Sequence, residues 1–132
     1  MELARLQAAL VMLDDARYLR DGGRWASAIS RAYYCSYQAM WAALGTPAQA
    51  HQWRHAAITA HFVRGYWFAP AHPKTGPGLL ESLRRPLQWL YQKRIDIDYD
   101  IKSVSQATAE RAVEIAERVC SEVQQKSGGP LS

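Results

Sequence analysis

Apolar residues recur at helical spacing along most of the chain, and this pattern restricts the fold more than any other feature. Residues 2–20 carry one apolar stripe, which ends at Gly22 and Gly23 because glycine readily adopts the left-handed conformation that closes a helix. Residues 25–44 carry a second stripe, which stops at the turn sequence 45–47. We therefore expect the chain to begin with two helices joined by a short turn.

The rest of the pattern predicts further helices separated by breaks. We expect a third helix, a proline- and glycine-rich loop and a fourth helix over residues 49–68, 69–78 and 79–94. Pro86 should kink the fourth helix, unless the helix begins near Arg85 and holds Pro86 in its first turn. Residues 95–99 alternate with a period of two, which predicts an extended segment, and Ser103 is the expected N-cap of the last helix.

These segments predict an all-α fold, an up-and-down bundle of four to five helices. A chain of 132 residues has the size of a single domain, which we expect over 1–126, followed by a disordered tail over 127–132. No stretch is apolar over the length of a membrane span, so a cytoplasmic location is expected. Cys35 and Cys120 lie in apolar stripes and are expected to be buried free thiols, and the sequence indicates no metal site and no cofactor.

Positive charge is concentrated in the middle of the chain. Only one acid, Glu81, stands between residues 51 and 94, against these basic residues: Arg54, Arg64, Lys74, Arg84, Arg85, Lys93 and Arg94. All 4 histidines lie in the same region. This region is the expected electropositive face, suited to phosphate, RNA or an acidic partner, although a merely solvated basic surface has the same composition.

Two stretches place polar groups where helices should pack, and a buried polar group costs free energy unless it is satisfied or used. One runs from Ala28 to Tyr34 and reads Ala-Ile-Ser-Arg-Ala-Tyr-Tyr; the other runs from Arg94 to Tyr99 and reads Arg-Ile-Asp-Ile-Asp-Tyr. In order and spacing they resemble the small stand-alone prokaryotic branch of the HEPN domains (higher eukaryote and prokaryote nucleotide-binding). The resemblance extends from about Leu3 to Val123.

The resemblance implies a helical bundle that forms a homodimer and works with a separately encoded minimal nucleotidyltransferase, in a toxin–antitoxin or defence-type pair. In the ribonuclease branches of that family, an arginine followed four to six residues later by a histidine forms a metal-independent cleavage centre. Here Arg94 is followed by Tyr99 in place of the histidine. A tyrosine, with an ordinary pKa of about 10, is a poor general base near neutral pH, but it can donate a hydrogen bond or stack on a base.

We expect these residues to contact RNA or a nucleotide: Arg94, Asp98, Tyr99, Arg31, Arg54, Arg84 and Arg85. The aromatic residues beside the main stripe of the second helix are expected to form an interface: Tyr34, Tyr37 and Trp41. Arg94 has a second interpretation, in which it pairs with Asp96 or Asp98 and only closes the end of the bundle.

Arg31 also has two interpretations. It is either a buried cation paired with an acid such as Asp14, Asp15 or Asp98, or a second cation that converges with Arg94 on one anionic pocket. Arg54 and His61 have the nuclease spacing in the wrong helix, which we interpret as coincidence. His51 and His55 are interpreted as surface residues rather than metal ligands, because no acid or cysteine stands at a helpful spacing.

The sequence favours a binding and interaction module for RNA or a nucleotide. The alternative from a different class is a metal-independent endoribonuclease toxin that uses Arg94 with Tyr99 in place of the usual histidine. A structural oligomer without a ligand is a third hypothesis.

Overall fold

The computed structural model of the chain describes residues 1–99 and 104–127. This part of the chain contains five α-helices and a short 3₁₀ helix, and no strand. Their bounds are α1 Leu3–Asp21, α2 Trp25–Leu44, α3 His55–Arg64, η1 Glu81–Leu83, α4 Arg84–Tyr99 and α5 Gln106–Lys126. The predicted all-α class is confirmed.

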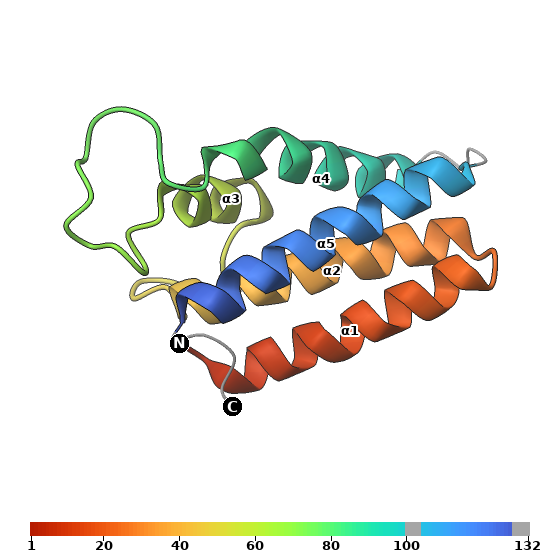
Figure 1. Cartoon of the computed structure of the whole chain (residues 1–132), viewed down its shortest axis with the longest axis horizontal. Coiled ribbons are helices and arrows are strands. Elements are labelled where there is room, and N and C mark those ends of the chain that lie inside the picture. Colours follow the sequence, from red (N-terminus) through yellow and green to blue (C-terminus); the bar gives the residue numbers. More distant parts are fainter. Residues whose placement is uncertain (100–103, 128–132) are drawn as a thin grey trace.

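Helix α2 lies at the centre of the bundle and packs against each of the other four α-helices. Figure 1 shows α1, α2 and α5 as three long rods along the bundle, with α4 on the side opposite α1 and the short α3 beside the start of α4. The segment between α3 and η1 extends from this end as a long loop (Figure 1). A central helix requires apolar residues around most of its surface, and α2 has them.

Small side chains let the three long helices approach closely. Ala9 and Ala16 of α1, Ala28 and Ala32 of α2 and Ala112 of α5 are all fully buried. The two cysteines lie at the contact between α2 and α5 as buried free thiols, with their sulfur atoms 3.4 Å apart. Within the described residues, no helix combines the length and the apolar content that a membrane crossing needs.

The prediction of an extended segment over 95–99 is wrong, because α4 continues without a break to Tyr99. Side-chain bonds across one helical turn accompany this continuation: the Gln92 amide donates to Asp96 over 2.9 Å, and Arg94 donates to Asp98 over 3.3 Å. Asp96 and Asp98 thus accept hydrogen bonds from side chains four residues earlier in the helix, and do not form one face of a strand.

The beginning of α4 follows the second of the two predicted alternatives. The helix starts at Arg84 and holds Pro86 in its first turn, where the missing N–H of proline costs nothing. The predicted N-cap Ser103 lies outside the described residues, and the observed N-cap of α5 is Ser105, whose hydroxyl accepts a hydrogen bond from the Thr108 N–H. The predicted tail lies outside the described residues except for Ser127.

Helix α3 is shorter than the predicted 49–68. It ends at Arg64 because Gly65, with φ of 85°, takes the left-handed conformation that closes it. Before α3 the chain is not helical, and the Trp53 indole N–H donates to the Gly45 carbonyl oxygen over 2.7 Å, which ties this segment to the end of α2. The result is a ten-residue helix held between two non-helical segments.

The chain returns to the bundle at Gly78, which lies directly against the end of α3. A β-carbon at Gly78 would stand 2.3 Å from the Val63 carbonyl oxygen, and the Leu80 N–H bonds that same oxygen over 2.9 Å. We expect Gly78→Ala to lower the free energy of unfolding by about 1–3 kcal/mol, because the backbone has to move. Denaturant unfolding measures this change.

Gly22→Ala is the matched control for that substitution. Gly22 has φ of −86°, and a β-carbon there would lie 3.4 Å from the nearest atom, so the change should stay within about 0.5 kcal/mol. An equal loss of stability in both variants would contradict the close contact at Gly78.

Candidate functional site

Arg94 lies in a cage of aromatic rings. Its guanidinium carbon is 4.8 Å from the ring centre of Tyr33, 5.6 Å from that of Tyr34 and 5.7 Å from that of Tyr91. Helix α2 supplies the first two rings and α4 supplies the third together with the arginine. The side chain of Arg94 is only 15% exposed, so these cation–π contacts hold it in a fixed position.

The hydrogen bonds of Arg94 to described residues come from a single nitrogen. Nη1 donates to the Tyr34 hydroxyl over 3.0 Å and to Asp98 over 3.3 Å, while the buried Nε has no partner. Burial alone would lower the pKa of Arg94, but Tyr34, Tyr33 and Asp98 outweigh it and raise the pKa above its ordinary value. Arg94 is therefore a permanent cation whose donors are only partly used.

His55, the first residue of α3, belongs to the same cluster. Its ring stacks on that of Tyr37 at 4.3 Å between centres and on that of Tyr33 at 5.5 Å, and its Nδ1 is hydrogen-bonded to the Tyr33 hydroxyl. Burial and then the charge of Arg94 lower the pKa of His55 below its ordinary value of 6.5, so the imidazole is neutral at neutral pH. We call Arg94, Tyr33, Tyr34, Tyr91 and His55 the Arg94 cluster.

The interpretation of His55 as a surface residue is wrong, since the ring is half-buried in this cluster. Local sequence gives no signal for it, because His55 and Arg94 are far apart along the chain. The only sequence signal was the set of aromatic residues beside the main stripe of α2, which predicted an interface there. Burial also raises the pKa of Tyr33, so its hydroxyl stays protonated.

A groove of about 270 Å³ opens beside the cluster, between α3 and α4. Helix α3 lines it with His55, Ala56 and Ala60, and α4 lines it with Arg84, Gln88 and Tyr91. His55 and Tyr91 belong to both the groove and the Arg94 cluster. We call this feature the α3–α4 groove.

Asp98 is brought to Arg94, but Tyr99 is not. Tyr99 is 85% exposed, and five residues along a helix correspond to a rotation of about 140°, which directs it away from Arg94. The structure records no contact between the two side chains, although both lie within its described part. A role for Tyr99 in RNA contact stays a prediction.

Arg31 is exposed, and it makes no salt bridge with Asp14, Asp15 or Asp98, so its interpretation as a buried, paired cation is wrong. It lies one helical turn before Tyr34 and lines a surface pocket with that residue. Tyr34 in turn accepts a hydrogen bond from Arg94. Arg31 thus borders the Arg94 cluster without entering it.

The other basic candidates lie at the beginnings of α3 and α4. Arg84 lines the groove and donates to Glu81 over 2.7 and 3.0 Å. Arg54 is the exposed N-cap residue of α3, next to His55, and Arg85 is exposed on α4. Of these three, only Arg84 lines the groove.

Two of the three predicted interface residues are buried within the chain itself. Tyr37 and Trp41 are 6% and 5% exposed, because residues after α2 fold back over them. The Tyr37 hydroxyl donates to the Trp53 carbonyl oxygen, and the Trp41 indole N–H donates to Thr46 over 3.1 Å. Only Tyr34, at 37% exposed, is available at the surface.

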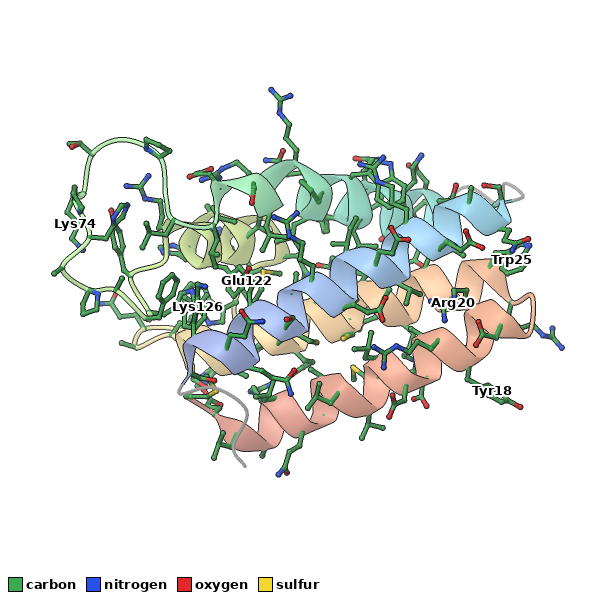
Figure 2. All side chains as sticks on the ribbon, viewed as in Figure 1. Tyr18, Arg20, Trp25, Lys74, Glu122 and Lys126 are labelled. Carbon is green, nitrogen blue, oxygen red and sulfur yellow. The ribbon has the colours of Figure 1, made fainter. Side chains whose placement is uncertain are left out.

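The described residues hold no group of three histidine, cysteine, aspartate or glutamate side chains arranged to bind a metal. Figure 2 shows all described side chains on the bundle, with the labelled Arg20 on α1 between the ribbons of α1 and α2 in this view. Arg20 pairs with Asp21 over 2.9 Å and serves below as a control arginine outside the cluster.

We expect Arg94→Gln to raise the pKa of His55, because it removes the cation that opposes protonation of the imidazole. The pKa should stay below 6.5, since burial is the larger cause and is retained. A titration of the imidazole protons by NMR measures the change, and Arg20→Gln is the control. An unchanged His55 pKa in Arg94→Gln would contradict the electrostatic contact.

The comparison with protein-family models gives one finding: the model described as the HEPN domain matches residues 3–126. No match was found among curated proteins or solved structures. The matched region covers α1 to α5, and therefore includes every residue of the Arg94 cluster and of the α3–α4 groove. The chain belongs to the HEPN domain family.

Proposed function

We propose that this HEPN domain is an RNA- or nucleotide-binding module, with Arg94 as its central phosphate contact. The observation that carries the proposal is the position of Arg94: a permanent cation, fixed by three tyrosine rings, whose hydrogen bonds to described residues use Nη1 alone. A guanidinium group binds a phosphate through two parallel N–H bonds.

Aromatic rings beside a phosphate-binding arginine suit single-stranded nucleic acid. Tyr34 is partly exposed, and His55 and Tyr91 line the adjoining groove. Bases of single-stranded RNA stack on such rings, while the backbone phosphates bind the cation. Arg31 beside Tyr34 extends the positive surface along α2.

A homodimer and a separately encoded minimal nucleotidyltransferase partner complete the proposal. Its support is the resemblance to stand-alone prokaryotic HEPN proteins, in a toxin–antitoxin or defence-type pair. The exposed Tyr34 and Arg31 offer a polar aromatic surface next to the cluster for such a partner.

A metal-independent endoribonuclease is the second candidate, and the position of His55 favours it. A histidine that stays neutral at neutral pH, stacked in the cluster that holds Arg94, is the type of general base that abstracts a proton from a ribose 2′-hydroxyl. Arg94 would stabilise the negative charge that develops on the phosphate. In this candidate His55 has the catalytic role that the sequence analysis assigned to Tyr99.

RNA affinity tests the proposed binding. We expect Arg94→Gln to weaken binding of single-stranded RNA about tenfold, because a charge-assisted hydrogen bond is lost. The slope of log K against log salt should become shallower by about 0.7, the value for one lost phosphate contact on a single strand. Fluorescence anisotropy at several salt concentrations measures both.

Arg20→Gln removes the same charge from α1, outside the Arg94 cluster and the α3–α4 groove, and should leave affinity nearly unchanged. Thermal melts of both variants separate loss of the site from loss of fold. Equal affinity of wild type and Arg94→Gln, with both folded, would show that RNA does not bind at Arg94.

Cleavage in the presence of EDTA separates the two candidates. A binding module leaves the RNA intact, and this is the expected outcome. An endoribonuclease would cleave it without metal, and cleavage would disappear in both Arg94→Gln and His55→Asn but persist in Tyr99→Phe. Cleavage that disappears in Tyr99→Phe would restore Tyr99 as a catalytic residue.

A further inference from the structure

We infer that the α3–α4 groove holds one base of a bound single-stranded RNA, next to the phosphate on Arg94. The inference rests on the proposed RNA binding and adds to it a specific subsite. It assigns a role to groove residues that the phosphate contact leaves unused, above all Ala56 and Gln88.

The groove and the Arg94 cluster are continuous through two rings. His55 and Tyr91 lie within 18° of parallel, with ring centres 6.3 Å apart, and both line the groove. Tyr91 also lies against Arg94, at 5.7 Å. A base that stacks on this end of the groove is therefore attached to a phosphate within reach of the guanidinium group.

The middle of the groove is neutral and offers both hydrogen-bond donors and hydrogen-bond acceptors. Ala56 and Ala60 leave space on the α3 side. Gln88 on α4 and Thr59 on α3 make no side-chain hydrogen bond to another described residue, so an amide and a hydroxyl can bind the edge of a base. A base combines flat apolar faces with such polar edges.

The two ends of the groove are positive. At one end lies the N-terminus of α3, whose N-cap residue provides no side-chain cap. The backbone N–H groups of its first two residues have no partner among the described residues, so they can bind an anion. At the other end Arg84 pairs with Glu81, and Arg64 stands 4.0 Å from the same carboxylate. Two guanidinium groups against one carboxylate leave a net positive charge.

The negative groups near the groove are already engaged. Hydrogen bonds from Arg84 and from the Gly78 N–H lower the pKa of Glu81 to about 2, so it stays charged and paired. Asp96 accepts from Gln92, and Asp98 accepts from Arg94. A positive end next to a neutral centre matches a nucleotide, in which a neutral base is joined through the ribose to an anionic phosphate.

The size of the groove fits one base. Its volume is about 270 Å³, and the seven residue steps from Arg84 to Tyr91 span about 10 Å along α4. A duplex could not use it, because paired bases are stacked inside the double helix. The groove therefore favours a single strand over a duplex.

The test compares an eight-nucleotide oligouridylate with an abasic ribose-phosphate oligomer of the same length. We expect wild type to bind the oligouridylate about tenfold more tightly. Ala56→Leu, which fills the groove, should reduce that preference to near unity and leave the affinity for the abasic oligomer unchanged. Gln88→Leu, which removes the amide at similar volume, should reduce it in part.

Gln7→Leu on the exposed face of α1 is the matched control and should keep the full preference. Melting curves establish that each variant is folded; Gln88 is exposed, so its variant provides a second test if Ala56→Leu is unstable. Equal wild-type affinity for both oligomers would overturn the base subsite while the Arg94 phosphate site stands. An equal loss for both oligomers in Ala56→Leu would also overturn it, and no binding of either oligomer would overturn the proposed function together with the subsite.

Discussion

The packing of α2 against all four other helices is the constraint on which the rest of the structure depends. Its alanines are buried in the bundle, where small side chains permit close approach, and its tyrosines contact His55 of α3 and Arg94 of α4. Helix α2 thus contributes to two different environments. One is a close contact of small buried residues, and the other is the set of aromatic rings around Arg94. The Arg94 cluster exists because Tyr33 and Tyr34 stand on the side of α2 that the other long helices leave uncovered.

The fold was largely predictable from sequence, because the information was local. Apolar spacing and glycine breaks identified α1 and α2 closely, and the bundle class followed. The errors occurred where two signals compete. Residues 95–99 alternate like a strand, yet i,i+4 side-chain pairs keep them helical, and α3 ends early because Gly65 closes it. Such outcomes depend on side-chain partners that a pattern of apolar residues does not contain.

The site was predictable only in part. Arg94 and Asp98 come together because they lie one turn apart on α4, and their spacing was visible in the sequence. The approach of His55 was not, because it depends on how residues after α2 fold back over Tyr37. The same return of the chain buries Tyr37 and Trp41, which a helix pattern alone presents as free surface. The way in which the segment after α2 folds back thus determined which aromatic residues are buried in the core and which belong to the candidate site.

The position of His55 at the beginning of α3 links ligand binding to local folding. A short helix with non-helical segments on both sides and no side-chain cap has little stability of its own. Its first turn is held through the ring of His55, stacked on Tyr37 and hydrogen-bonded to Tyr33. Any molecule that adds contacts to this ring also adds to the stability of the first turn of α3. Ligand binding is then thermodynamically coupled to the folding of this turn. Slower amide hydrogen exchange in residues 55–58 therefore reports that the site is occupied.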